Sequence, residues 1–212
     1  MSSSRGFPVS EFETRCVKAQ MLMATADISA ILLTTEPEVR YFSGFLTPFW
    51  QSPTRPWFMV IPAAGKPVAV IPEIGRDCMA ATWIDDIRTW SSPDPEDDGV
   101  SLLMEVLRDA VGDGSAFGVA MGPETHLRMP LLDFEMLTRT LALDIADATP
   151  ILRQLRMLKS EAEIDKIAHI CGIVSGVFEG MPGWLSAGMT GVDVFRRFRI
   201  EALQAGADDV PY

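Results

Sequence analysis

Cysteine and histidine are scarce in this chain of 212 residues, and their scarcity restricts its chemistry. The three cysteines, Cys16, Cys78 and Cys171, are far apart and lie in apolar stretches. An odd number at such spacings fits neither a disulfide framework nor a zinc site. We interpret them as free core thiols of a reducing compartment and expect a cytoplasmic protein. His126 and His169 each lack a second histidine or cysteine at ligand spacing, so neither is assigned to a metal.

Long apolar runs and an excess of basic residues are also missing. No run approaches the roughly 18 apolar residues of a membrane helix, and residues 1–12 lack the apolar core of a secretory signal. The formal charge of −11 opposes the phosphates of a nucleic acid. Nucleotide-binding glycine loops and the serine-hydrolase G-x-S-x-G motif are absent from the sequence. We therefore expect a protein that binds neither nucleic acid nor membranes.

Apolar runs of strand type alternate with helical patterns through most of the chain. The pattern predicts helices over 10–26, 36–46, 73–83, 99–111 and 125–140, and strands over 28–33, 57–62, 67–71, 84–90, 115–122 and 143–148. Ser10 and Glu13 predict a capping box for the first helix, and Gly44 predicts the end of the second. Such alternation indicates an α/β fold.

Residues 47–57, TPFWQSPTRPW, form the most unusual loop of the sequence. Prolines stiffen its backbone, so its exposed aromatic side chains would offer a firm apolar contact surface. Arg55 adds a planar cation that suits a carboxylate. The alternative interpretation is that Trp50 and Trp57 simply close the edge of the sheet.

The stretch from Pro150 to Phe178 indicates a second unit. A basic segment leads to Ser160, which predicts a helix cap with Glu163 as its capping-box partner. Apolar residues then recur at helical spacing, which predicts one buried face; they are Ile164, Ile167, Ala168, Cys171, Val174 and Phe178.

Two motifs resemble the creatinase, prolidase and aminopeptidase P superfamily, whose members are two-domain pita-bread proteins. Residues 38–45, EVRYFSGF, are similar to the Asn-Ile-Arg-Tyr-Leu-Thr-Gly-Phe pattern that follows the first strand of that family. The Arg-Tyr and Gly-Phe pairs match, whereas Glu38 and Ser43 replace Asn and Thr. The second motif, from Arg153 to Glu163, resembles the basic junction between the two domains of the family.

The resemblance implies a creatinase N-terminal-like layered sheet with flanking helices over residues 1–150. It also implies a linker and the opening helices of an incomplete pita-bread α+β domain over residues 151–212. In the family, two aspartates, a histidine and two glutamates hold a pair of divalent metals on strands that follow these helices. We therefore assign no catalytic or metal residue here and expect manganese, cobalt or zinc only in a full-length member. The 212-residue chain alone is expected to be inactive.

The implied function is the N-terminal part of a metal-dependent hydrolase that resembles Xaa-Pro dipeptidases and aminopeptidases. This N-terminal part would mediate homodimerisation and shape the pocket for a small peptide or amide substrate. Because N-domain loops of relatives can reach the active site of a partner subunit, Phe49, Trp50 and Arg55 are the substrate-binding candidates. Two alternatives stay open: a non-catalytic binding or dimerisation module, and a creatinase-like, metal-free C–N hydrolase.

Overall fold

The computed structural model describes residues 5–52, 55–114 and 116–210, which form two compact units. The first unit is Gly6–Leu158. The second contains the described residues 159–210 together with Arg5, whose guanidinium lies 2.7 Å from the Asp208 carboxylate. No helix within the described ranges has the length and hydropathy that a membrane crossing requires.

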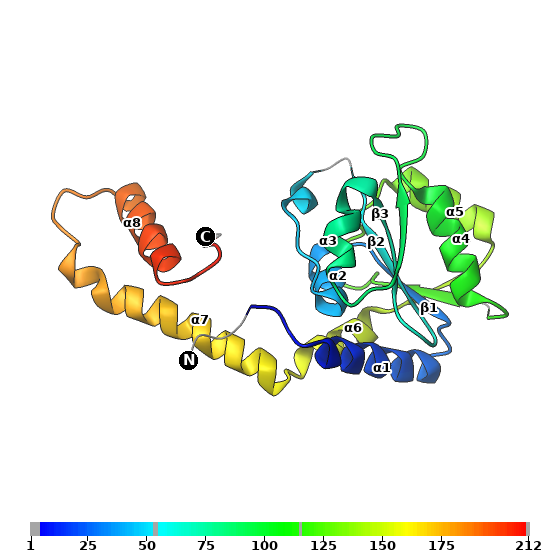
Figure 1. The fold of residues 1–212 in the computed structure, drawn as a ribbon, viewed down its shortest axis with the longest axis horizontal. Coiled ribbons are helices and arrows are strands. Elements are labelled where there is room, and N and C mark those ends of the chain that lie inside the picture. The colour runs from blue at the N-terminus through cyan, green and yellow to red at the C-terminus, as the bar shows by residue number, and fades with distance from the viewer. Residues whose placement is uncertain (1–4, 53–54, 115, 211–212) are drawn as a thin grey trace. The chain divides into compact units, whose positions relative to one another are not determined.

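One mixed sheet forms the centre of the first unit (Figure 1). Its strands, within the described residues, are β1 (Ala30–Leu33), β2 (Phe58–Pro62), β3 (Val68–Pro72), β4 (Asp86–Trp90), β5 (Ala116–Val119) and β6 (Asp144–Asp147), in the spatial order β4-β3-β2-β1-β5-β6. β2 is antiparallel to both β1 and β3, as the predicted hairpin requires. The pairs β1–β5, β5–β6 and β3–β4 are parallel.

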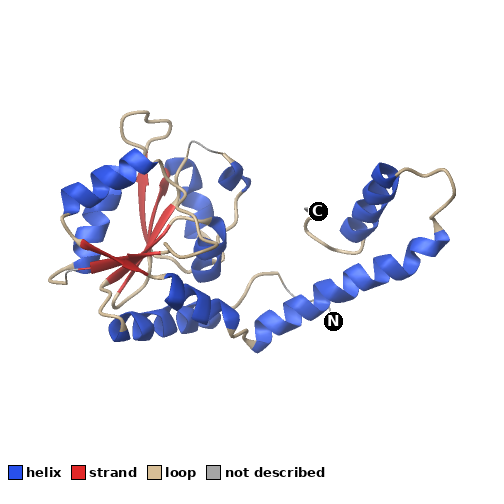
Figure 2. Ribbon diagram, turned by 180° about the vertical axis from the view of Figure 1, so that it is seen from behind, coloured by secondary structure: helices blue, strands red, loops and turns tan. Residues whose placement is uncertain are grey.

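Helices cover both faces of this sheet (Figure 2). One face packs against α1 (Val9–Thr25), α2 (Glu36–Ser43), α3 (Arg76–Ala80) and α6 (Thr149–Met157), and the other against α4 (Val100–Val111) and α5 (Leu131–Leu141). In β1, Ile31 and Leu33 face the α1 side, whereas Ala30 and Leu32 face the α4 side. Burial on both faces explains why β1, β2 and β3 appear in the sequence as continuous apolar runs.

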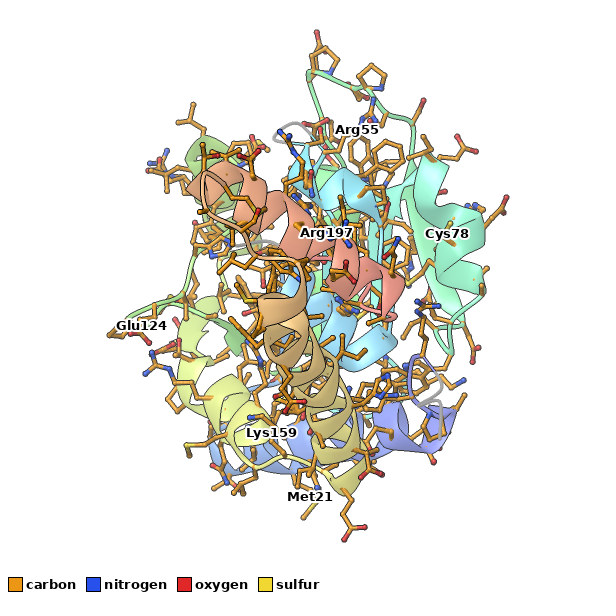
Figure 3. The ribbon with its side chains drawn as sticks, turned by 90° about the vertical axis from the view of Figure 1, so that its left-hand side faces the viewer. Met21, Arg55, Cys78, Glu124, Lys159 and Arg197 are labelled. Atoms are coloured by element: carbon orange, nitrogen blue, oxygen red, sulfur yellow. The ribbon has the colours of Figure 1, made fainter. Side chains whose placement is uncertain are left out.

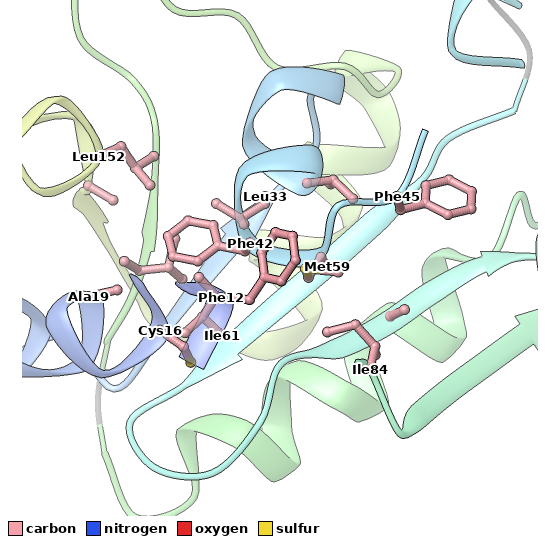
Figure 4. Packing of buried hydrophobic residues seen from close by; sticks show 14 of the residues in the cluster. Phe12, Cys16, Ala19, Leu33, Phe42, Phe45, Met59, Ile61, Ile84 and Leu152 are labelled. Atoms are coloured by element: carbon pink, nitrogen blue, oxygen red, sulfur yellow. The ribbon is translucent and has the colours of Figure 1, made fainter. Parts of the chain in front are cut away.

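Aromatic and aliphatic side chains from distant segments meet in the α1-side core (Figure 4). Phe12 of α1 and Phe42 of α2 pack over Met59 and Ile61 of β2. The buried indole N–H of Trp83 donates to the Phe42 carbonyl at 2.8 Å. This bond satisfies a buried donor and ties the segment before β4 to α2.

The structure confirms the predicted α/β fold and corrects several local predictions. The helix predicted over 125–140 begins only at Leu131, because Pro130 precedes it and the Arg128 amide instead donates to the Thr34 hydroxyl. The segment predicted as one helix over 73–83 forms a 3-10 turn, η2 (Glu73–Gly75), followed by the short α3. The predicted Ser10 capping box is wrong, because α1 begins at Val9 after Pro8.

The cysteine prediction is correct for only one thiol. Cys16 is buried on the inner side of α1. Cys78 and Cys171 are exposed, because Cys78 lies on the outer side of α3 (Figure 3) and Cys171 on an uncovered face of a long helix. Both were predicted to lie in the core.

The segment predicted as a linker is a helix of the first unit. Residues 149–157 form α6, which buries Ile151, Leu152 and Leu155 in the α1-side core. The Tyr41 hydroxyl also donates to the Leu155 carbonyl at 3.1 Å. The first compact unit therefore reaches Leu158, eight residues beyond the boundary that we placed at residue 150.

The second unit is a helix pair, α7 (Glu161–Gly180) and α8 (Gly191–Gln204), joined through η3 (Met181–Gly183). The capping box at Ser160 is confirmed: its hydroxyl accepts from the Glu163 amide, and the Glu163 carboxylate accepts from the Ser160 amide. Val177 packs with Ala202 and Ala207 between the helices.

The α7 face that was predicted to be buried is open in this chain. It carries Ile164, Ile167 and Phe178, which are 53%, 48% and 58% exposed. Ile173 and Val177 pack on α8, and the Phe178 ring centroid lies 4.9 Å from that of Phe198 of α8. The sheet expected to cover the rest of this face belongs to the remainder of the pita-bread domain, so that packing stays a prediction.

Candidate functional site

Two loops and the carboxyl end of β1 meet at one edge of the sheet. Leu33 at the end of β1 pairs with Met59 near the start of β2, so the loop 47–57 that leads into β2 lies at the carboxyl end of β1. β5 runs parallel to β1, so the segment that follows it, residues 120–130, starts at the same edge. In open α/β sheets, ligands bind outside the carboxyl ends of parallel strands. This edge of the sheet is therefore the candidate site.

The loop 47–57 begins with a short turn of 3-10 helix, η1 (Pro48–Gln51). Thr47 caps it, because its hydroxyl oxygen accepts from the Phe49 amide at 3.3 Å. Pro48 in the first turn fixes a suitable backbone angle without losing a needed donor. The local sequence thus specifies where Phe49 and Trp50 point.

Phe49 and Arg55 lie together on the accessible part of this loop. The Phe49 side chain is 37% exposed, and the Arg55 guanidinium carbon lies 5.6 Å from the centroid of the Phe49 ring. Arg55, labelled in Figure 3, is half-buried. A cation held beside an aromatic ring can bind a carboxylate while the ring contacts an apolar group.

Trp50 is not an exposed contact residue, which corrects the expected character of the loop. It is only 6% exposed, because its ring packs 5.9 Å from that of Trp57. Trp57 is fully buried and packs in turn against Phe45. Both tryptophans are core residues, although they lie beside the central strand β2 and not at a sheet edge. A contact between Trp50 and a substrate stays a prediction.

Arg128, which no sequence motif indicated, links its own loop to the loop before β2 and to Thr34 after β1. Its guanidinium donates to the Arg55 carbonyl at 2.9 Å and to the Ser52 carbonyl, and it lies 5.2 Å from the centroid of the Trp50 ring. Burial lowers the pKa of Arg128, and the nearby Glu36 acts in the opposite direction. The only signal in the sequence is an arginine placed between two apolar residues, Leu127 and Met129.

A second polar group ties the ends of β5 and β6 to α6. Asp147 accepts from the Met121 amide at 3.2 Å and from the Thr149 amide at 2.9 Å. The Thr149 hydroxyl oxygen accepts from the amides of Met121 and Gly122. Hydrogen bonds from the Thr149 side chain and backbone lower the pKa of Asp147. These bonds are used within the fold, so we assign the group no ligand.

The described residues do not supply a metal centre. Over residues 5–52, 55–114 and 116–210, there is no group of three or more histidine, cysteine, aspartate and glutamate side chains that could hold an ion. The donor set of a divalent metal site therefore does not fit this part of the chain. No chemical step is assigned here to a metal.

The model of the creatinase/prolidase N-terminal domain matches residues 15–158, which is more than half of the chain. The chain belongs to this family. The match ends at the last residue of the first compact unit. It includes the Arg40-Tyr41 and Gly44-Phe45 pairs on which the resemblance was based.

Relatives of this creatinase/prolidase chain are described as dipeptidases. It is 26% identical over 202 residues to probable dipeptidases PepE of Mycobacterium bovis and Mycobacterium tuberculosis. The match covers 90% of this chain and 48% of theirs, so the chain spans about half the length of the curated relatives.

Solved structures share the fold. The dipeptidase PepE of Mycobacterium ulcerans superposes with a TM-score of 0.74 at 24% identity, over 97% of this chain and 53% of that one. The prolidase of Thermococcus sibiricus gives a TM-score of 0.78 at 18% identity, over 98% and 53%. At these identities the likeness shows the fold, and the chemistry must be argued from the site.

Proposed function

We propose that this chain forms the N-terminal part of a metal-dependent hydrolase that cleaves small peptides, with Xaa-Pro dipeptides as the substrate class. The family and the dipeptidases among its relatives support a peptidase. Because the described residues do not provide a metal centre, the proposal assigns the manganese, cobalt or zinc ions to protein outside them. The free thiols suit a cytoplasmic enzyme.

The observation that carries the proposal is the pairing of Arg55 with Phe49 on a braced loop at the carboxyl edge of the sheet. In the proposed enzyme this loop is a wall of the substrate pocket and lies at a homodimer interface. Arg55 binds the carboxylate of the peptide, and Phe49 contacts its apolar side chain. Trp50 supports Phe49 and Arg55, because its ring packs against that of Trp57.

Protein purified from the complete reading frame tests this assignment. We expect hydrolysis of Xaa-Pro dipeptides that is lost with a chelator and restored by manganese, cobalt or zinc. Arg55→Gln should raise KM by about tenfold or more, because a charged hydrogen bond to the substrate is lost, with little change in kcat. The matched control is Arg139→Gln, since Arg139 is exposed on α5 and pairs only locally with Glu135. Absence of hydrolysis with each of the three metals would overturn the proposal.

A second candidate, a non-catalytic dimerisation module, is favoured by the exposed apolar face of α7. The two functions differ in what they require of the protein. A module should form a stable dimer as the 212-residue chain, and its complete reading frame should neither bind these metals nor cleave dipeptides. Sedimentation velocity combined with the peptidase assay separates the two.

A further inference from the structure

Arg128 contacts two segments that lie far from it in the sequence. It belongs to the segment after β5, yet its guanidinium reaches two backbone carbonyls of the loop 47–57, those of Ser52 and Arg55. Its own amide donates at 3.1 Å to the hydroxyl of Thr34, which directly follows β1. One residue thus links Ser52 and Arg55 of the loop to Thr34 after β1.

The chemistry of the contact requires arginine. The planar guanidinium presents several N–H donors in a fixed fork, so it can bind two carbonyls at once while its face lies over the Trp50 ring. A lysine ammonium carries one charge on a flexible stem and cannot hold both carbonyls in the same geometry. Glu36 is the acidic group that acts on this cation.

The bound carbonyls belong to the residues that matter for the proposed pocket. Arg128 holds the main chain of Arg55 itself, and it covers the ring of Trp50, the residue next to Phe49. The prolines at 48 and 56 restrict the backbone but form no hydrogen bond through their nitrogen. The turn Pro48–Gln51 is held by its own cap, whereas the carbonyls of Ser52 and Arg55 accept from Arg128.

We propose that Arg128 is a positioning residue for substrate binding: its guanidinium clamps the loop 47–57 so that Phe49 and Arg55 face the substrate together. This inference rests on the proposed function, in which that loop is a wall of the pocket. Arg128 touches no substrate in this scheme and acts through Arg55. Its loss should therefore weaken substrate binding and leave the chemical step nearly unchanged.

The clamp is tested first on the 212-residue chain by hydrogen exchange of the loop amides. Arg128→Lys and Arg128→Gln should speed exchange in residues 47–57 by about tenfold or more, while amides of β1 and β2 stay protected. The matched control is Arg153→Lys. Arg153 also donates to a carbonyl of the segment after β5, that of Pro123, but it does not hold the loop 47–57. Unchanged exchange of the loop would overturn the clamp.

The positioning role is tested in protein from the complete reading frame by a double-mutant cycle on KM. Arg128→Lys should raise KM for an Xaa-Pro dipeptide by about tenfold with kcat nearly unchanged. In an Arg55→Gln background the same substitution should have little further effect, because Arg128 acts through Arg55. Fully additive effects would overturn the positioning role. An inactive parent protein would overturn that role with the proposed function, whereas the exchange result would still decide the clamp.

Discussion

The position of a Cβ atom on Gly44 would lie 2.8 Å from Cζ of Phe12. Gly44 ends α2 in the left-handed region, with φ +76°, and its amide donates to the Arg40 carbonyl. The glycine therefore serves two purposes. It permits the backbone turn, and it leaves room for the Phe12 ring of α1 to pack against the end of α2.

Gly44→Ala should destabilise the first unit by about 2–3 kcal/mol, because backbone strain and overpacking act together. Gly65→Ala is the matched control: Gly65 has φ +88°, but no atom lies within 4 Å of its Cβ position. Gly65→Ala should lower the free energy of unfolding by only about 1 kcal/mol, because only the backbone is strained. Urea denaturation of both variants measures the difference. Equal losses would show that the contact with Phe12 carries no cost.

The three cysteines should differ in the rate at which their thiols react with a labelling reagent. Burial raises the pKa of Cys16 to about 11, so its thiol stays protonated, and its Sγ also donates to the Gly65 carbonyl. Cys78 and Cys171 are exposed. A thiol reagent at mildly alkaline pH should label these two within minutes and Cys16 only after unfolding.

Peptide mass spectrometry identifies the labelled cysteines, and the same reaction in denaturant serves as the control. Fast labelling of Cys16 in the native protein would contradict its place in the core. The exposed pair also marks a limit of sequence reasoning. Cys78 precedes Met79 and Cys171 follows Ile170, but the turn of a helix decides which of these side chains faces the core.

The sheet could be predicted because both of its faces are buried. The run at β1 is apolar at each position, and the Ala-Ala-Gly-Lys turn before β3 marks the hairpin. Boundaries failed where a tertiary contact decides. Pro130 marks the start of α5 locally, and the hydrogen bond from the Arg128 amide to Thr34 keeps the residues before it in a loop. No local pattern contains a partner 94 residues away.

The candidate site could be predicted only in part. Composition pointed to Phe49, Trp50 and Arg55, since aromatic residues, prolines and an arginine rarely occur so densely. Which aromatic faces outward depends on Trp57, against which Trp50 packs. Arg128 was missed for the same reason as the helix boundary, because its function lies in contacts with segments remote in the sequence.

Asp147 should make the stability of the first unit depend on pH. Hydrogen bonds from Thr149 and Met121 lower its pKa in the folded state. A carboxyl with a lowered pKa stabilises the fold above its unfolded value of about 3.9, and this contribution is lost as the pH falls through the folded pKa. Because Asp147 is exposed, we expect the contribution to be below about 1 kcal/mol.

Asp147→Asn should therefore destabilise the protein at neutral pH, and the difference from wild type should shrink in acid. Urea denaturation over a range of pH measures it. Asp144→Asn, at the other end of β6, controls for the change in net charge. A difference that grows as the pH falls would contradict the assignment of charge-favouring hydrogen bonds to Asp147.

A lysine substitution should have different effects on hydrogen-exchange protection at two apolar residues of α7. Val177 is buried against Ala202 of α8, whereas Ile167 is 48% exposed on another side of the helix. In the 212-residue chain, Val177→Lys should remove hydrogen-exchange protection from α7 and α8, since it buries a charge at their contact. Ile167→Lys should leave that protection unchanged.

In protein from the complete reading frame, Ile167→Lys should become damaging, with a loss of about 3 kcal/mol or more, because the proposed hydrolase covers this face of α7 with further protein. Glu179→Gln, at an exposed position of the same helix, changes the net charge by the same +1 and serves as the control. The measurement is denaturant unfolding of both proteins. If Ile167→Lys leaves the free energy of unfolding of both proteins unchanged, no further protein packs on the open face of α7. The sequence pattern from Ile164 to Phe178 would then have another cause than packing within the hydrolase.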